Sequence, residues 1–205
     1  MSVSRTTQSP RENYPPGAQG PDWHLLNLTL SDLASFQGGA STGVTIREEE
    51  RKTLERYKLI GKDQAPIDIV AVYLSALEKY PSVVDIVRIS LSFLRPLPDD
   101  VMRKAIDIVL RQENSPETET PKIFAIARLV GLKAYVPDDI KRILFYAVHD
   151  RDVLRSATHE AIESLTEEQR MILRQAASEI IDHPRLREPQ RQRLARCFEL
   201  QFYPR

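Results

Sequence analysis

Residues 136–165, VPDDIKRILFYAVHDRDVLRSATHEAIESL, are the stretch of sequence that decides the fold. Apolar residues recur at helical spacing on both sides of a short polar segment, His149 to Asp152. Pro137 suits the first turn of a helix, because the N–H that proline lacks has no partner there, and the two aspartates after it favour the positive end of the helix dipole. The stretch predicts a helical hairpin, two amphipathic helices joined by a tight turn.

Similar helix openings, a proline or threonine followed by acidic residues, occur at four places in the chain. They are Pro66-Ile67-Asp68, Pro98-Asp99-Asp100, Pro137-Asp138-Asp139 and Thr166-Glu167-Glu168. Each opening predicts a pair of helices, with bounds near 67–80 and 82–95, 98–112 and 120–133, 137–149 and 152–164, and 167–181 and 189–202. One hairpin cannot bury its apolar faces alone, so we expect the four to stack. A charged helix of about 14 residues, opened by a capping box at Thr45 and Glu48 and ended by Gly61, is predicted before them.

The turn and second helix of the opening stretch carry a resemblance to a known family. An acidic turn at Asp150 and Asp152 leads into Leu154-Arg155, and Ala161-Ile162 follows at the position of a later small-aliphatic pair. This pattern resembles the HEAT repeat, although Thr158 replaces the usual alanine and the openings recur at intervals mostly shorter than the roughly 40 residues of that family. The resemblance implies a curved scaffold or adaptor surface with no chemistry of its own. We therefore expect an all-α fold, a short right-handed α-solenoid of about four stacked helical hairpins with an extra N-terminal helix and a disordered N-terminal tail.

The first 45 residues differ from the rest and predict a separate region, 1–45, ahead of a helical repeat domain at 46–205. Residues 1–21 contain few large aliphatic side chains and predict disorder. A stripe of Trp23, Leu26, Leu30 and Leu33 then predicts a short helix at 23–36, before a flexible joint at Gln37–Gly43, although Leu26, Leu28 and Leu30 also alternate as in a strand. Two roles stay open for this segment: a cap on the first hairpin, or an anchor that binds a partner through Trp23, Leu26, Leu30 and Leu33.

Composition limits the location and the classes of partner. The 29 basic and 29 acidic side chains of the 205 residues cancel, so no global field attracts nucleic acid or an anionic membrane. No apolar segment approaches the roughly 20 residues that span a bilayer, and the N-terminus does not resemble a secretory signal. The single cysteine excludes an internal disulfide. These features predict a soluble, intracellular, cytoplasmic protein without a membrane partner.

Residue patterns for catalysis and metal binding are weak. His159 and Glu163 lie four residues apart on one predicted helix, but the second histidine of a zinc protease motif is missing. Cys197 has no histidine in its local sequence and is expected to be a buried structural thiol. No glycine-rich phosphate-binding pattern occurs. We expect no enzyme activity, no cofactor and no metal. A helical enzyme that acts on DNA or a cofactor conjugate is a weaker alternative, and it would need an acid such as Asp85 or Asp107 in an aromatic-lined groove.

Arginines on the second helices of the hairpins are the most suggestive candidates for binding. Arg88, Arg128, Arg155 and Arg193 or Arg196 could form a ladder along the concave face that second helices commonly line in HEAT-type solenoids. Such a ladder would bind an acidic peptide or a nucleic-acid backbone. The alternative is that each arginine pairs with a nearby acid and fixes a turn. The segment Asp182–Arg205, with six arginines, three acids and the aromatic residues Phe198, Phe202 and Tyr203, leaves the same two readings open.

These patterns predict a non-enzymatic protein–protein interaction module, a scaffold or adaptor subunit of a larger assembly. The second hypothesis is a HEAT-like protein that binds nucleic acid through an arginine-lined concave face and a basic C-terminal helix.

Overall fold

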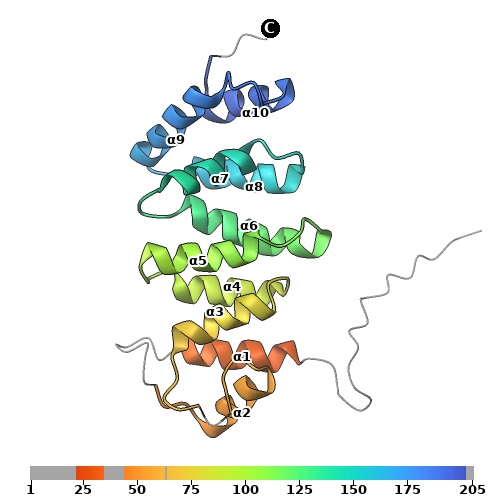
Figure 1. The fold of residues 1–205 in the computed structure, drawn as a ribbon, viewed down its shortest axis with the longest axis vertical. Coiled ribbons are helices and arrows are strands. Elements are labelled where there is room, and N and C mark those ends of the chain that lie inside the picture. The colour runs from red at the N-terminus through yellow and green to blue at the C-terminus, as the bar shows by residue number, and fades with distance from the viewer. Residues whose placement is uncertain (1–21, 35–43, 63, 202–205) are drawn as a thin grey trace, which may run out of the picture.

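Ten α-helices and no β-sheet make up the part of the chain that the computed structural model describes, residues 22–34, 44–62 and 64–201 (Figure 1). The helices are α1 Trp23–Ala34, α2 Glu48–Arg56, α3 Ile69–Lys79, α4 Val84–Leu94, α5 Asp99–Leu110, α6 Pro116–Val130, α7 Pro137–Ala147, α8 Asp152–Glu163, α9 Glu167–Ile180 and α10 Glu188–Phe198. The predicted all-α class is confirmed. The predicted disordered tail at 1–21 and flexible joint at 37–43 lie outside the described residues, as do Phe202 and Tyr203.

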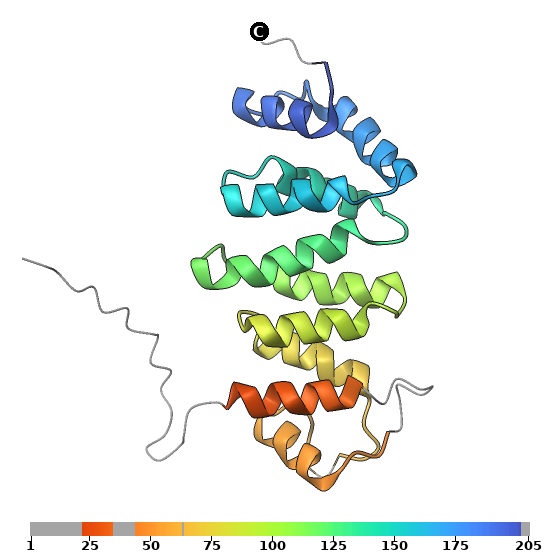
Figure 2. The ribbon, with the colours of Figure 1, turned by 180° about the vertical axis from the view of Figure 1, so that it is seen from behind.

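From α3 onward the helices follow one another along the long axis of the molecule, and α2 lies beyond α1 at one end (Figures 1 and 2). Consecutive helices pack as the pairs α3–α4, α5–α6, α7–α8 and α9–α10, which correspond to the four predicted helix pairs. Packing between pairs joins α3 to α5 and α7 to α9 on one side, and α4 to α6 and α6 to α8 on the other. The apolar stripes meet in one core that runs through the stack.

Helix α2 is shorter than predicted because its chain reverses before Gly61. The backbone N–H of Arg47, not of Thr45, is bound by the carboxylate three residues later, Glu50, at 2.8 Å. At the other end Lys58 adopts the left-handed conformation, φ 56°, and the N–H groups of Lys58 and Leu59 donate to the carbonyls of Glu55 and Leu54 at 2.9 and 2.8 Å. This pair of bonds satisfies the last carbonyls of a helix, so α2 ends at Arg56 without a glycine.

Helix α6 begins earlier than the predicted residue 120. Ser115 precedes the helix and its N–H donates to Thr118 Oγ1 at 3.0 Å, while Pro116 takes the first helical position. The predicted polar loop Gln112–Glu117 is therefore partly helical, and Pro121 is buried inside the helix. Lys122, 2% exposed, directs its ammonium to the Gln112 carbonyl and to Asn114 Oδ1, which ties the shortened loop to α6.

Two ion pairs join the related openings of α5 and α7. The Nε–H of Arg103 donates to Asp139 Oδ2 at 2.8 Å, and Arg142 pairs with Asp107 in the reverse direction. Asp139 is 2% exposed and also accepts the Val136 N–H at 2.9 Å. The Pro-Asp-Asp opening thus begins α7, as the sequence predicts, and fixes α7 to α5.

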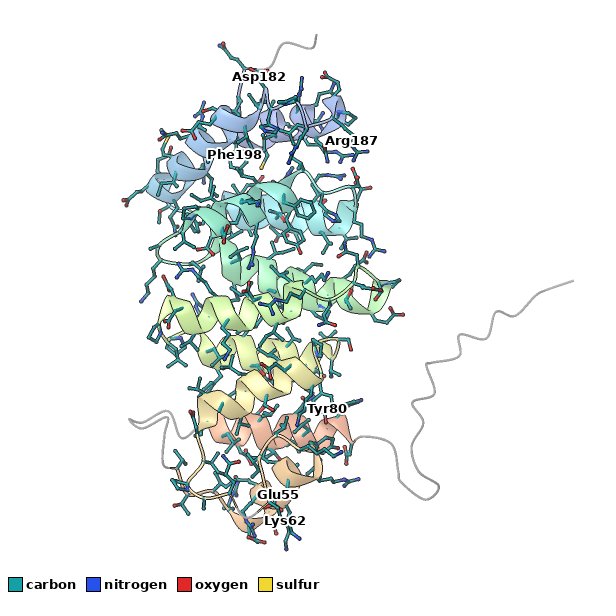
Figure 3. The ribbon with its side chains drawn as sticks, viewed as in Figure 1. Glu55, Lys62, Tyr80, Asp182, Arg187 and Phe198 are labelled. Atoms are coloured by element: carbon teal, nitrogen blue, oxygen red, sulfur yellow. The ribbon has the colours of Figure 1, made fainter. Side chains whose placement is uncertain are left out.

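Helix α1 packs against α4 and α2 at the N-terminal end of the stack. Leu26, Leu30 and Leu33 are each 0% exposed, and the Tyr73 hydroxyl of α3 donates to the Leu30 carbonyl. Trp23 contacts Tyr57 and Tyr80, with ring centroids 6.1 and 5.0 Å away. Figure 3 shows Tyr80 beside the end of α1 where the chain enters the fold. In this structure α1, together with α2, covers the N-terminal end of the core.

Candidate functional site

The first two candidate arginines lie apart on the second helices of their pairs. Arg88 of α4 pairs with Asp85 at 3.2 Å, and both side chains are more than half exposed. Arg128 of α6 donates to Ser92 Oγ at the long distance of 3.5 Å. Burial lowers the pKa of Arg128, and the neighbouring Arg95 lowers it further. Neither contact links Arg88 to Arg128.

The next two candidate arginines meet at the turn between α7 and α8. Arg155 donates to the His149 carbonyl at 2.7 Å and pairs with Asp152. Arg193 of α10 donates to the Val148 carbonyl at 3.2 Å and to Asp150 Oδ1 at 2.9 Å. Hydrogen bonds from Arg193 and then from Arg187 hold the pKa of the Asp150 carboxyl below its usual value. These guanidiniums support the turn, which is the local role that the sequence left open.

His149 is surrounded at the same turn by rings and cations. Its imidazole stacks on the Tyr146 ring, with ring centroids 5.7 Å apart. It meets the Phe145 ring edge-on, with centroids 5.2 Å apart. Its Nδ1 accepts the Arg151 N–H at 3.1 Å. Burial lowers the pKa of His149; Asp150 opposes that shift, whereas Lys122, Arg151 and Arg155 add to it. These surroundings favour the neutral form of the His149 imidazole.

Arg196 lines a polar cleft of about 440 Å³ between α8, α9 and α10. Three arginines, three glutamates, His159 and Cys197 contribute to its walls; the charged side chains are Arg170, Arg174, Arg196, Glu163, Glu167 and Glu199. His159 Nε2 lies 2.9 Å from the Ala147 carbonyl, and burial raises the pKa of the Cys197 thiol to about 12. A thiol with that pKa stays protonated at neutral pH and is a poor nucleophile. Within residues 22–34, 44–62 and 64–201, no group of three His, Cys, Asp or Glu side chains is arranged to hold a metal ion.

The predicted anchor residues Trp23, Leu26, Leu30 and Leu33 are packed into the fold. Binding of a partner through the three leucines would require α1 to leave α4, so their partner-binding role stays a prediction. The outer face of the same helix is apolar too, because Leu25 and Leu28 are exposed.

An apolar groove of about 450 Å³ lies between α7, α9 and α10. Its floor is formed by the buried side chains of Leu144, Val148 and Leu194. Around the floor lie further apolar and small residues, Pro137, Ile140, Phe145, Ala176, Ile180 and Leu186. The α7 residues are spaced by three and four positions and so share one helix face. Phe145 is 56% exposed, the largest exposed fraction among the bulky apolar side chains of the described residues.

Three charged side chains line this groove: the cations Lys141 and Arg185, and the carboxylate Glu179. A smaller hollow of about 170 Å³ continues past Phe145 toward α5, and Asp107, Arg111 and Arg142 line it. Asp107 is the acidic partner of both Arg111, at 3.5 Å, and Arg142. Taken together, the apolar groove and the smaller hollow are lined by four cations and two carboxylates, so their border carries a net positive charge.

The sequence does not reveal this groove, because stacking of the hairpins predicts that the apolar stripe of α7 is buried. The sequence holds one local signal. Phe145 does not belong to the stripe of Ile140, Leu144 and Val148; it follows Pro137 and Lys141 at intervals of four residues, along the neighbouring line of the helix. The inclination of α9 relative to α7 and α8, seen in Figures 1 and 2, is a tertiary property that this signal does not encode.

Comparisons with protein-family models, with characterised proteins and with solved structures gave no match. None of the helices in the described ranges is long and apolar enough to cross a membrane.

Proposed function

We propose that this protein is a non-enzymatic protein–protein interaction module, a scaffold or adaptor subunit built as a short, right-handed, HEAT-like α-solenoid. The succession of helix pairs along one axis supports the architecture, because stacked pairs produce the extended surfaces that such modules use. We place its action in the cytoplasm, where a chain with a single cysteine needs no internal disulfide.

The apolar groove of α7, α9 and α10 carries the proposal. An exposed apolar surface with a polar border is the usual form of a protein-binding site. Phe145 has the properties of a hot-spot residue, since it is a large aromatic residue, more than half exposed, that lines both hollows. The polar cleft at Arg196 is less suited to this role, because arginines and glutamates balance one another across it.

Quantitative affinity purification from native cells tests the proposal. The tagged full-length protein is compared with Phe145→Ala and with the control Met171→Ala, an exposed apolar residue of α9 outside the groove. We expect Phe145→Ala to lower the recovery of at least one copurified protein more than tenfold, as for a hot spot worth about 2 kcal/mol. The interaction should then be reproduced with purified components. Equal recovery with all three proteins, or recovery of this chain alone, would contradict a binding role for the groove.

Nucleic-acid binding by the candidate arginines is the second proposal, and the contacts favour it less. Arg88, Arg155 and Arg193 already face acids, and Arg155 and Arg193 also hold carbonyl groups of a turn. A salt titration with random duplex and single-stranded DNA separates the two proposals, because phosphate contacts produce a steep fall of affinity with salt. Absence of binding at low salt would exclude this second function.

A further inference from the structure

The length and shape of the groove set the size of its occupant. The α7 residues that border it run from Pro137 to Val148, and this distance corresponds to about 16 Å along a helix axis, or three turns. One wall comes from α7 and the other from α9 and the start of α10, so the groove follows a helix direction. A short amphipathic helix is the recurring ligand of a groove of this kind.

The charges at the border set the chemistry of the occupant. Lys141, Arg185 and Glu179 give the apolar groove a net charge of one positive unit. Arg111, Arg142 and Asp107 give the smaller hollow the same net charge. Lys141, Arg185 and Arg111 are exposed, so their ammonium and guanidinium groups can reach a ligand. Carboxylates on a ligand would form charge-assisted hydrogen bonds there, and they would steer association electrostatically.

We propose that this groove binds an acidic amphipathic helix of about three turns from a partner protein. The inference rests on the proposed function and adds the class of ligand. The apolar face of the helix packs on Leu144, Ile180 and Leu194 beside the Phe145 ring, and its Asp or Glu side chains lie toward Lys141 and Arg185. The first 21 residues of this chain do not have that chemistry, since their charged residues are Arg5, Arg11 and Glu12 and bulky aliphatic residues are rare among them.

Two designed peptides of about 14 residues test the ligand class. They share apolar residues at helical spacing, and their remaining positions are mainly glutamate in one and lysine in the other. Binding of each fluorescent peptide to the full-length protein is followed by anisotropy at low and at high salt. We expect the acidic peptide to bind at least roughly tenfold more tightly at low salt, and the ratio to fall as salt screens the border charges. Equal affinities, a preference for the basic peptide, or no binding of either would overturn the inference.

Charge reversal on the protein provides the sharper test. Lys141→Glu/Arg185→Glu should abolish the preference for the acidic peptide or invert it, while Lys62→Glu/Lys133→Glu, which makes the same charge change at exposed positions outside the groove, should leave the preference in place. Lys141→Ala/Arg185→Ala should show an intermediate preference. Phe145→Ala should weaken binding of the acidic peptide at least tenfold, whereas Met171→Ala should not. A preference that survives charge reversal, or equal effects of the two alanine variants, would contradict the assigned site.

Two further readouts separate this inference from the proposed function and from self-association. If Phe145→Ala loses copurified proteins but the peptides show no charge preference, the acidic ligand is wrong and the binding module stands. If Phe145→Ala loses no copurified protein, the binding role of the groove fails as well, and recovery of this chain alone would contradict the proposed function itself. Sedimentation of the wild-type protein and of Phe145→Ala checks for a second copy in the groove: a dimer that dissociates in the variant would replace the partner helix by self-association.

Discussion

The apolar helix faces are buried at one end of the stack and partly exposed at the other. At the N-terminal end, α1 packs against α4 and α2 and buries Leu26, Leu30 and Leu33 completely. Toward the C-terminal end, α7, α9 and α10 border an apolar groove, and Phe145 stays more than half exposed. Stacked amphipathic helices thus bury an apolar stripe when the chain supplies a covering helix, and leave it partly exposed where none of the described segments lies over it. The difference predicts that residues at one end determine stability and residues at the other determine binding.

The largest effect is expected from shortening a side chain at the covered end. Leu30→Ala should lower the free energy of unfolding by about 2–5 kcal/mol, because it removes buried methyl groups and leaves a cavity between α1 and α4. Chemical denaturation of the full-length protein measures this change. Leu28→Ala, on the exposed face of the same helix, is the control and should change stability by less than about 0.5 kcal/mol. Similar values for the two variants would mean that α1 is not part of the cooperative core.

The next effect concerns the ion pair that fixes the groove wall α7 to α5. Arg103→Met should cost about 2–3 kcal/mol, because the carboxylate of Asp139 would stay buried without its cation. Arg88→Met removes an ion pair of the same type between exposed side chains and should cost less than about 1 kcal/mol. Urea denaturation distinguishes the two cases. Equal costs would show that the Asp139 carboxylate is solvated in solution.

A smaller effect should appear in the pH dependence at the end of α7. The pKa of His149 is lower in the folded chain than its ordinary value of 6.5, so the unfolded chain takes up the proton first as the pH falls. Its contribution to stability is fully present above pH 6.5 and is lost as the pH falls below that value. His149→Gln should therefore reduce the loss of thermal stability between about pH 7 and about pH 5.

His183→Gln is the matched control for that measurement. His183 accepts the Arg185 N–H at 3.2 Å as His149 accepts the Arg151 N–H, but its side chain is exposed. If the two variants flatten the pH profile equally, burial of His149 is not the cause.

The smallest change in stability is expected at the open end. Phe145→Ala should alter the free energy of unfolding by less than about 1 kcal/mol, since more than half of the residue is exposed and its ring meets Tyr146 and His149 edge-on, while it weakens binding of a partner helix. Thermal denaturation beside the peptide anisotropy assay measures both properties on one variant. A loss of several kcal/mol of stability would assign Phe145 to the core and remove the contrast between the two ends.

The regular part of this fold could be predicted from sequence, and the site could not. Helical spacing and the Pro-Asp-Asp openings predict α5 and α7, because helix starts depend on residues next to one another in the chain. The exposure of Phe145 depends on how α9 and α10 are placed more than 20 residues later. The partners of Arg193, the Val148 carbonyl and Asp150, likewise depend on the packing of α10 against α7, which no local pattern specifies.

Helix ends in this protein show a different limit of prediction. Glycine is the usual residue for a left-handed helix ending, and Gly61 was therefore the expected end of α2. Lys58 adopts that conformation instead, and Glu199 does so after α10. The left-handed conformation of these two residues lets the next N–H, of Leu59 or Leu200, donate to a carbonyl of the helix, that of Leu54 or Ala195. These hydrogen bonds offset the strain that a Cβ atom causes. Such endings depend on a balance of strain and hydrogen bonding that residue type alone does not reveal.

Asp139 has a consequence for the way the molecule unfolds. Its carboxylate accepts the N–H of Val136, the residue before α7, and the Nε–H of Arg103 from α5. Fraying of the first turn of α7 displaces Asp139 and so weakens a tertiary ion pair, and detachment of α5 leaves the Asp139 carboxylate without its cation. The boundary between the second and third helix pairs is accordingly a poor place for the chain to divide into independently opening units. Amide hydrogen exchange at the start of α7 should follow opening of the central stack as a whole, with the protection of core amides rather than that of a helix end.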